Sequence, residues 1–415
     1  MRRATMYKPI SIPERVAGMT QLDRSKFSCR HVVPSLALDK SDSLNDELSK
    51  FKPMLLKMPG RKPVQEVDSV RRLLLDPSLD HSKLMETYHI QPLEIELTYE
   101  NFTAQEAVQK VLSGSGSDVG GAGFSIVGHI VHLNLRAHLD PFKKVIGQIL
   151  LDKMKRVELV VNKTSQIESE YRNFNFEVLA GTAGTVVRVR EHGCLFELDF
   201  ATVYWNPRLA TEHNRVTLLL KPESVLFDVF AGVGPFAIPA ARKGCTVYAN
   251  DLNPSSFEYL VKNIKLNKVS HKVEAFNLDG RDFLKTVVRE KVKEKYSKAD
   301  VHVTANLPAI AVDFMDVFKD MDLPKGTMLH IHCYLFLKST AKKGFSAAWD
   351  MVLQKLGDFK GIFKITSHEE HFVRQVSPSK EMVRASFVIL YTDEDGPEDV
   401  EPAVKKSKPD TAAAD

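Results

Sequence analysis

Cysteine is scarce in this chain of 415 residues, because only Cys29, Cys194, Cys245 and Cys333 occur and no two of them form a CxxC pair. Cysteines this far apart exclude a zinc knuckle and a disulfide framework, and they indicate a reducing compartment.

No apolar run approaches the roughly 20 residues that span a bilayer, so we expect no membrane partner. The content of 43% hydrophobic and 27% charged residues is typical of a soluble protein with a full core.

Neither sign of charge dominates the chain. The net charge of +4 permits a polyanionic partner without requiring one. Acidic residues are absent before Glu14, and this part of the chain contains basic and hydroxyl side chains. Such a composition is typical of a weak mitochondrial presequence, and equally of a solvated basic arm.

The stretch from 225 to 254 predicts the opening of a Rossmann-like sheet. It begins with a short apolar run that is typical of a buried strand, and a helical pattern and a second strand follow. Between the first strand and the helix, Gly232 and Gly234 lack the Cβ atoms that would keep a ligand from the backbone. Asp251 ends the second strand about twenty residues further on, where a carboxylate suits the hydroxyls of an adenosine ribose.

The loop lacks the third glycine of the dinucleotide fingerprint G-x-G-x-x-G, because Ala237 stands at that position. It follows an acidic residue, Asp228, which is poorly placed for a phosphate and well placed for an ammonium group. The pattern D-x-F-x-G-x-G therefore favours S-adenosylmethionine, which carries no phosphate and ends in an amino acid. A glycine turn with a purely structural role is the alternative.

Strands and helices continue to alternate up to residue 391, which predicts a seven-stranded sheet. Asp279 follows the third strand and is either an acceptor for the adenine amino group or a helix N-cap. After the fourth strand, Asn306 and Pro308 favour a turn whose carbonyls and amide can hold a planar base. The predicted fold class is α/β, a Rossmann-like class I methyltransferase domain preceded by an α+β RNA-binding region.

Composition also predicts how the chain divides into parts. The N-terminal part has a proline-punctuated, basic beginning and a helical pattern over 64–75. A second part carries small groups of lysines and arginines, which would contact the phosphates of an RNA if several shared a face and are otherwise a solvated surface. The predicted parts are an N-terminal region (1–112), a Gly/Ser-rich loop (113–123), an α+β middle domain (124–215), the Rossmann-like domain (216–392) and a disordered tail (393–415).

Two histidine patterns resemble metal sites without matching one. His330 and His332 share one strand face, but no third ligand follows at a suitable spacing. The run HEEH at 368–371 places its histidines three apart, whereas the zinc-protease pattern HExxH places them four apart. We therefore expect no metal.

Six motifs occur together in a characteristic order. They are YWNPRL at 204–209, TEH at 211–213, FDVFAGVGPFA at 227–237, NDLNP at 250–254, NLDG at 277–280 and NLPA at 306–309. In this order the chain resembles the eukaryotic and archaeal class I, knot-free tRNA (guanine-N1-)-methyltransferases, which modify guanosine 37 beside the anticodon. The resemblance covers roughly residues 120–392.

The resemblance implies methyl transfer from S-adenosylmethionine to N1 of guanosine 37 in tRNA, which supports reading-frame maintenance, with inosine 37 as a further substrate. It implies a monomer whose N-terminal domain senses the outer corner of the tRNA. Family members occur in the mitochondrion, the nucleus and the cytosol, so we expect this chain in the mitochondrial matrix, the nucleus and the cytoplasm.

The chemistry requires a base, because guanine N1 carries a proton at neutral pH and is a poor nucleophile until that proton leaves. The resemblance implies Glu212 as this base and Arg172 as the cation that stabilises the charge developing on O6. From the residues alone, Glu212 is a carboxylate favoured by a helix N-terminus, and Arg172 is an ordinary surface arginine.

Asn306 would contact the target base as well as the cofactor. The cofactor residues implied by the family are His213, Asp251, Leu252, Asp279, Gly280 and Asn306, beside the loop residue Gly232, with Tyr204 and Phe230 as apolar walls.

Two other functions remain open from the sequence. The related wybutosine-pathway transferase uses the same cofactor and fold but moves the aminocarboxypropyl group to tRNA. A catalytically silent tRNA-binding protein on this scaffold would retain tRNA and produce no S-adenosylhomocysteine.

Overall fold

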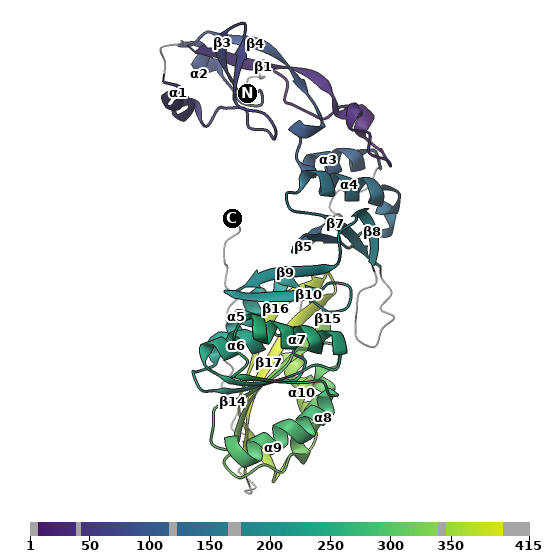
Figure 1. Cartoon of the computed structure of the whole chain (residues 1–415), viewed down its shortest axis with the longest axis vertical. Helices are drawn as coiled ribbons and strands as arrows, with labels where there is room; N and C mark the ends of the chain where they lie inside the picture. The colour runs from purple at the N-terminus through teal and green to yellow at the C-terminus, as the bar shows by residue number, and fades with distance from the viewer. Residues whose placement is uncertain (1–6, 39–42, 116–122, 165–175, 339–345, 393–415) are drawn as a thin grey trace. The chain divides into compact units, whose positions relative to one another are not determined.

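The computed structural model describes residues 7–38, 43–115, 123–164, 176–338 and 346–392. Its internal contacts divide the chain into two compact units (Figure 1). The first unit contains residues 1–164 and 176–184, and the second contains residues 165–175 and 185–415. Residues 116–122 of the predicted loop at 113–123 and the predicted disordered tail from residue 393 lie outside the described residues, and Ser113–Ser115 of that loop form a short 3-10 helix.

The first unit contains two four-stranded sheets. In order across each sheet, the strands are β2 (Val64–Val67), β3 (Val70–Leu74), β1 (Cys29–Leu38) and β4 (Ile90–Leu97), and then β5 (Phe124–Val127), β6 (Ile130–Leu133), β7 (Leu159–Lys163) and β8 (Phe176–Gly181). The α-helices described in this unit are α1 (Leu44–Phe51), α2 (Ser82–Met85), α3 (Ala104–Leu112) and α4 (Lys143–Lys153). Short 3-10 helices lie at Glu14–Val16, Arg24–Phe27, Tyr99–Asn101, Ser113–Ser115 and Ala137–Phe142.

One hydrophobic core joins both sheets of the first unit. Val33 of β1 and Leu97 of β4 belong to the same buried cluster as Val131 of β6 and Ile146 of α4. This division differs from the predicted boundaries near residues 112 and 215, because burial of these side chains links segments on both sides of the Gly/Ser-rich stretch. The predicted domain limits stay predictions.

The helix predicted over 64–75 is wrong, since these residues form the β2–β3 hairpin. The register pairs Val67 with Val70, so the turn consists of Asp68 and Ser69. Both turn residues have positive φ angles, +51° and +63°, as the two-residue hairpin turns that match strand twist require. The apolar residues at 64, 67, 70, 73 and 74 match the period of a helix by coincidence. They belong to two different strands, which the turn at Asp68 and Ser69 separates.

The second unit is built on a seven-stranded sheet, as the sequence predicts. Its strand order is β13 (Val273–Phe276), β12 (Thr246–Asn250), β11 (Val225–Asp228), β14 (Val301–Ala305), β15 (Met328–Lys338), β17 (Lys380–Tyr391) and β16 (Phe363–Ser377). Neighbouring strands from β13 to β15 are parallel, and β17 is antiparallel to both β15 and β16. A separate hairpin, β9 (Val186–Glu191) and β10 (Cys194–Asp199), precedes the sheet.

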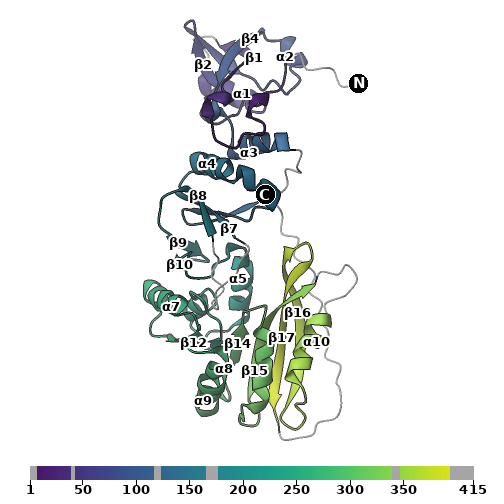
Figure 2. The same ribbon diagram turned by 90° about the vertical axis from the view of Figure 1, so that its right-hand side faces the viewer.

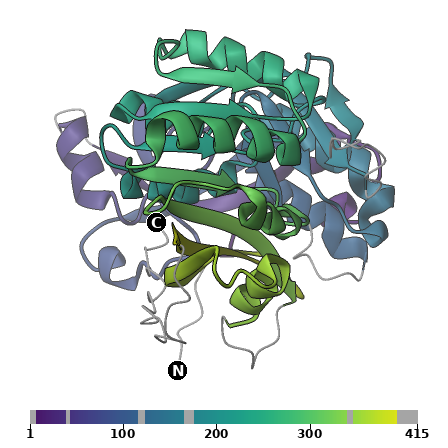
Figure 3. The ribbon, with the colours of Figure 1, turned by 90° about the horizontal axis from the view of Figure 1, so that it is seen from below.

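Helices pack against the faces of this sheet (Figures 2 and 3). They are α5 (Ala210–Leu219), α6 (Ala237–Lys243), α7 (Pro254–Leu266), α8 (Gly280–Phe283), α9 (Arg289–Lys291) and α10 (Ser346–Leu356), with 3-10 segments η7 (Pro207–Leu209) and η10 (Ala311–Asp320). Two π-helical segments, η8 (Leu284–Val288) and η9 (Val292–Tyr296), continue α8 and α9, so residues 280–296 form one helical stretch with two wider turns. Helix α10 lies beside β15, β16 and β17 (Figure 2).

Local sequence accounts for the βαβ unit that opens the sheet. All residues of β11 and β14 are buried, which is typical of central parallel strands. Helix α6 ends where Gly244 takes a φ of +107°, a left-handed conformation that glycine adopts without a Cβ penalty. Helix α7 begins with Pro254 at its first position, and the Asn253 side chain caps it by accepting from the Ser255 N–H.

No helix among the described residues is both long enough and apolar enough to cross a membrane.

Candidate active site

The carboxyl ends of β11, β12, β13 and β14 lie side by side at one edge of the seven-stranded sheet, because these strands are neighbours and run parallel. Asp228, Asn250 and Ala305 are the last residues of β11, β12 and β14. The loops that follow them carry most of the residues predicted to hold the cofactor. Parallel α/β sheets bind their ligands at this edge.

The glycine loop after β11 is joined directly to the carboxylate at the end of β12. The Gly232 N–H donates to Asp251 Oδ2 over 2.8 Å, and Asp251 Oδ1 accepts from the Asn253 N–H over 3.0 Å. Gly232 has a φ of +55°, and a Cβ added to it would meet nothing within 4 Å. The loop therefore leaves open space beside Gly232, next to a carboxylate held in one orientation.

Asn250 holds three of these loops together. Its Nδ2 donates to the carbonyls of Val229 and Leu278 over 3.1 and 3.0 Å, and its Oδ1 accepts from the Leu278 N–H over 2.9 Å. The side chain is fully buried. Asn277, which is exposed, makes two similar bonds to the carbonyls of Asp251 and Leu252. The positions of the cofactor loops thus depend on two asparagine side chains.

We expect Asn250→Ala to cost about 3 kcal/mol of unfolding free energy, because it leaves buried backbone groups of Val229 and Leu278 without partners. Asn277→Ala is the matched control, since water can replace the bonds of an exposed side chain, and it should cost less than about 1 kcal/mol. Urea unfolding of both variants and the parent measures the difference. Equal losses in the two variants would contradict the role of Asn250.

Asp279 and Gly280 stand where β13 leads into α8. Asp279 Oδ1 accepts from the Arg281 N–H over 2.8 Å, so this carboxylate caps the helix. The side chain is exposed, which leaves it accessible to a ligand as well. A Cβ on Gly280 would lie 2.8 Å from Cε1 of Phe230, so glycine allows the Phe230 ring to pack against the start of the helix.

Two polar atoms at this edge have no hydrogen-bond partner among the described residues. They are Asp228 Oδ2 and Asn306 Oδ1, and both atoms are buried. Buried polar atoms are nearly always satisfied in folded proteins, by protein, water or ligand. Asp228 Oδ1 accepts from the Thr304 hydroxyl over 2.8 Å. The unpaired atoms are therefore candidates for contacts with a bound ligand.

Glu212, on the first turn of α5, is enclosed in the protein with only 4% of its surface exposed. Its Oε1 accepts from the Tyr334 hydroxyl over 2.9 Å and from Arg384 Nη1 over 2.7 Å. Tyr334 and Arg384 are opposite each other in the β15–β17 register. Burial and the neighbouring Glu212 carboxylate raise the pKa of Tyr334 far above its usual value, so the tyrosine stays a hydrogen-bond donor.

The family is shown by direct comparison with known proteins. A family model described as the TRM5/TYW2 methyltransferase domain matches residues 185–338, and one described as the TYW2 N-terminal domain matches residues 105–185. The tRNA (guanine(37)-N(1))-methyltransferase of Danio rerio is 42% identical, with 97% of this chain and 89% of that protein covered. The Homo sapiens protein of the same name is 43% identical, with 94% and 79% covered.

This chain belongs to the tRNA (guanine(37)-N(1))-methyltransferase family. Solved structures share its fold. Trm5b from Pyrococcus abyssi gives a TM-score of 0.62 at 24% identity, with 87% of this chain and 99% of that chain covered. The structure described as the complex of aTrm5 and tRNALeu gives 0.61 at 24% identity, with 87% and 100% covered. The predicted Rossmann-like methyltransferase fold is confirmed.

The matched methyltransferase domain begins at residue 185, where the long continuous segment of the second structural unit also begins. The chain is an S-adenosylmethionine-dependent methyltransferase. The strand ends fit this cofactor, since Asp251 offers carboxylate oxygens beside open space at Gly232, and Asp228 and Asn306 offer unpaired buried oxygens. These oxygens accept hydrogen bonds, as ribose hydroxyls, amino groups and an ammonium group require.

Asp228 gives this methyltransferase a measurable pH dependence. Burial raises its pKa to about 7, although the hydrogen bond from Thr304 opposes the shift. In the unfolded chain the same carboxyl ionises near pH 4. The folded protein therefore binds the extra proton between about pH 4 and pH 7, and its stability falls as the pH rises through this window.

We expect Asp228→Asn, which removes this titration, to be more stable than the parent at pH 8 by up to about 4 kcal/mol. Near pH 4 the two proteins should differ little. Urea unfolding without cofactor at both pH values tests this, with the exposed Asp320→Asn as control. A difference that is the same at pH 4 and pH 8 would show that Asp228 does not carry the titration.

Four further residues were predicted for the site of this methyltransferase, namely His213, Tyr204, Leu252 and Arg172. His213 is buried, and its Nδ1 lies 2.7 Å from Glu191 Oε1 while its ring packs edge-on against Phe236. Tyr204 and Leu252 are 44% and 41% exposed. Arg172 lies outside the described residues. The cofactor contacts of His213, Tyr204 and Leu252 and the role of Arg172 stay predictions.

Tyr334, Arg384 and Asn250 are the site residues that the sequence analysis missed. Tyr334 and Arg384 lie on the far strands of the sheet, more than 100 residues from Glu212 in the chain, and only the strand register brings them to its carboxylate. Asn250 lies inside the NDLNP motif. A polar residue at the end of a buried strand was the sequence signal that could have identified it as a site residue.

Several cations of the predicted tRNA-binding surface are paired with acids. Lys143 Nζ lies 2.7 Å from Glu177, and Arg188 Nε lies 2.7 Å from Glu197. The hydrogen bond from Lys143 lowers the pKa of Glu177. To contact a phosphate, each of these cations would have to divide its hydrogen bonds between the phosphate and its carboxylate partner.

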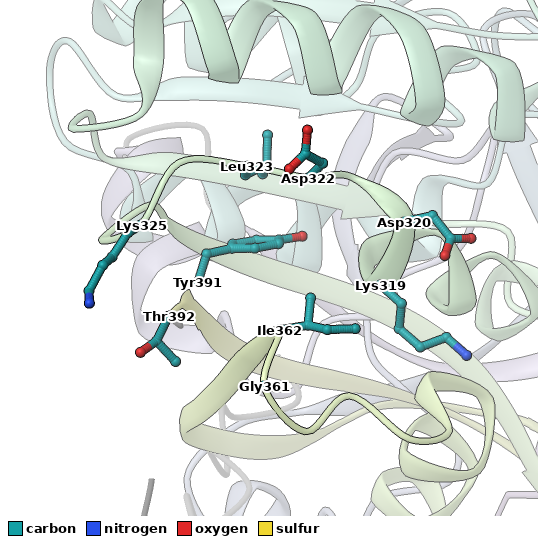
Figure 4. A pocket seen from close by; sticks show the side chains of 9 residues that line it. All are labelled: Lys319, Asp320, Asp322, Leu323, Lys325, Gly361, Ile362, Tyr391 and Thr392. Carbon is teal, nitrogen blue, oxygen red and sulfur yellow. The ribbon is translucent and has the colours of Figure 1, made fainter. Parts of the chain in front are cut away.

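A pocket also opens away from the cofactor edge (Figure 4). It lies where β15 and β16 begin and β17 ends, and the charged side chains of Lys319, Asp320, Asp322 and Lys325 line it. Parallel β14 and β15 place this end of the sheet opposite Asn306. The pocket is therefore separate from the candidate active site.

Proposed function

We propose that this chain transfers the methyl group of S-adenosylmethionine to N1 of guanosine 37 in tRNA. The relatives at 42% and 43% identity, which share most of its length, are named for this reaction. The observation that carries the mechanism is the buried Glu212 carboxylate, with both of its hydrogen bonds falling on one oxygen. A carboxylate held in this way fits the base that the reaction requires.

The bound cofactor supplies an electrophilic methyl group on a sulfonium. Guanine N1 becomes nucleophilic only when its proton leaves, so proton removal is the step in which a protein residue must act. A carboxylate accepts this proton if it is ionised in the resting protein and if one oxygen is able to face the base.

We assign this role to Glu212. The Tyr334 hydroxyl and Arg384 Nη1 both donate to Oε1 and hold the carboxylate in one orientation. Arg215 Nε lies 4.0 Å from Oε2. We assign proton acceptance to Oε2 and orientation of the carboxylate to the pair on Oε1, so Tyr334 and Arg384 are positioning residues.

Asn306 is the second residue that we place at the target base. Its buried Oδ1 is unpaired among the described residues, and the following turn is held by the Phe336 N–H, which donates to the Pro308 carbonyl over 3.0 Å. An amide oxygen there can accept from an amino group of guanine or of the cofactor. Arg172 is proposed to stabilise the charge that develops on O6.

The reaction is tested by incubating the full chain with S-adenosylmethionine and an unmodified tRNA transcript that has guanosine at position 37. Mass spectrometry of the nucleosides should show one added methyl group on that guanosine. Addition of the heavier aminocarboxypropyl group, or tRNA retention without S-adenosylhomocysteine, would overturn the proposal. A transcript with inosine at position 37 tests the wider specificity.

We also propose that the protein acts as a monomer, that residues 1–112 sense the outer corner of the tRNA, and that it is distributed among the mitochondrial matrix, the nucleus and the cytoplasm. The basic beginning of the chain supports the mitochondrial part of this distribution. Sedimentation velocity tests the monomer, since a larger species would contradict it. Mapping modified guanosine 37 in cytosolic and mitochondrial tRNA after depletion tests the distribution.

A further inference from the structure

Three potential metal ligands meet at the edge of the catalytic sheet that lies opposite the cofactor loops. Asp300 immediately precedes β14, His302 is the second residue of β14, and His330 is the third residue of β15. The two strands are parallel, and their register places His302 directly beside His330. One ligand atom of each residue lies within 4.8 Å of the others.

The distances from Asp300 to the two histidines match those between ligands of one metal ion, and the two imidazole rings lie stacked with their centroids 4.6 Å apart. Asp300 Oδ1 lies 3.4 Å from His302 Nε2 and 3.5 Å from His330 Nε2, which is longer than the usual 2.7–3.2 Å of a hydrogen bond. Ligands at about 2.0–2.1 Å from a tetrahedral zinc ion are separated from one another by about 3.4 Å. We propose that Asp300, His302 and His330 bind one zinc ion.

Hydrogen bonds around His302 and Asp300 orient these two side chains as metal ligands. His302 Nδ1 lies 3.1 Å from His332 Nε2, and His332 Nδ1 lies 2.9 Å from the Ser386 hydroxyl. Protons on both Nδ1 atoms give a continuous chain of donors that ends on Ser386, and they leave the His302 Nε2 lone pair for a metal. Asp300 Oδ2 accepts from the Ser224 hydroxyl over 2.6 Å, which orients Oδ1. Partners of this kind are typical of metal ligands.

The donor set selects the kind of ion. Two imidazole nitrogens and one carboxylate oxygen suit zinc or cobalt, whereas magnesium and calcium prefer sites made only of oxygen. The side chains of His330 and Asp300 are 31% and 27% exposed, so an ion can reach the site and a water molecule can complete its coordination. The ion would link β14 to β15 at the base of the sheet and would take no part in methyl transfer.

The spacing of the histidines along the sequence does not predict this site. His330 and His332 are two apart on one strand, but the structure places them in different roles. His332 is buried against His302, and the remaining ligands, His302 on β14 and Asp300 just before it, lie about thirty residues earlier in the sequence. Only the strand register shows the three ligands together.

The test uses the full chain without a histidine tag, stripped of metal with a chelator and then dialysed. Titration with cobalt should give one equivalent of bound ion with the strong visible absorption of tetrahedral cobalt, and zinc should displace it and raise the melting temperature. His330→Ala should weaken binding by more than tenfold, as should Asp300→Asn, which keeps the size of the side chain. The exposed His271→Ala is the control for binding at the surface and should bind as the parent does.

Two results would overturn the proposal. One is the absence of a stoichiometric ion in the folded parent protein. The other is equal weakening by His271→Ala and by the ligand variants, which would indicate adventitious binding to surface histidines. Because the readouts are metal content, absorption and melting temperature, they do not depend on the methyl-transfer reaction.

Discussion

Glu212→Gln is expected to lower the rate constant of methyl transfer to tRNA by about 10²- to 10⁴-fold, which is the usual contribution of a positioned general base. Glutamine has nearly the same shape, and its amide oxygen can still accept from Tyr334 and Arg384. It cannot remove the N1 proton. Affinity for S-adenosylmethionine should change little, because Glu212 is assigned to the target base rather than to the cofactor.

Single-turnover methylation of a tRNA transcript, with cofactor binding measured in parallel, tests this expectation. Glu258→Gln makes the same chemical change at an exposed position on α7 of the same unit, and it should keep the parent rate. A Glu212→Gln protein that binds the cofactor and methylates at the parent rate would show that another group removes the proton.

Arg384→Met is expected to cost about 3–5 kcal/mol of unfolding free energy, the usual effect of leaving one charge of a buried ion pair without its partner. Arg384 and Glu212 are 2% and 4% exposed, and their closest atoms are 2.7 Å apart. Methionine fills much of the volume of arginine but offers no positive charge. The loss therefore measures the buried charge of Glu212 rather than a cavity.

The double variant Glu212→Gln with Arg384→Met separates these effects. It contains neither charge, and glutamine can still accept from Tyr334, so much of the lost stability should return. Urea unfolding of the two single variants, the double variant and the parent gives the coupling energy of the pair. Purely additive losses would contradict a direct interaction between the two residues.

Arg384→Met also distinguishes a positioning residue from a purely structural one. Because Arg384 holds Oε1 of Glu212, its removal should lower the single-turnover rate constant of methyl transfer, while the affinity for S-adenosylmethionine changes little. A variant that is less stable but methylates at the parent rate would indicate that Arg384 acts on the fold alone.

The opening of the catalytic sheet could be predicted from sequence because its signals are local. The buried run of β11, the turn at Gly232 and the end of α6 at Gly244 each depend on neighbours a few residues away. The hairpin at 64–75 was misread for a related reason. Its apolar spacing fits a helix, and the positive φ angles of Asp68 and Ser69 are adopted only when the flanking strands pair with the rest of the sheet.

The sequence by itself determined the family, the cofactor and the order along the chain of the strands of the catalytic sheet, because glycines, caps and motif spacing act over short distances. The tertiary structure alone decided which strands are neighbours, and so which distant side chains meet. The Glu212–Tyr334–Arg384 group and the Asp300–His302–His330 group both depend on the register of β14, β15 and β17. Register is defined only between two paired strands, so it cannot be read from the sequence of one strand.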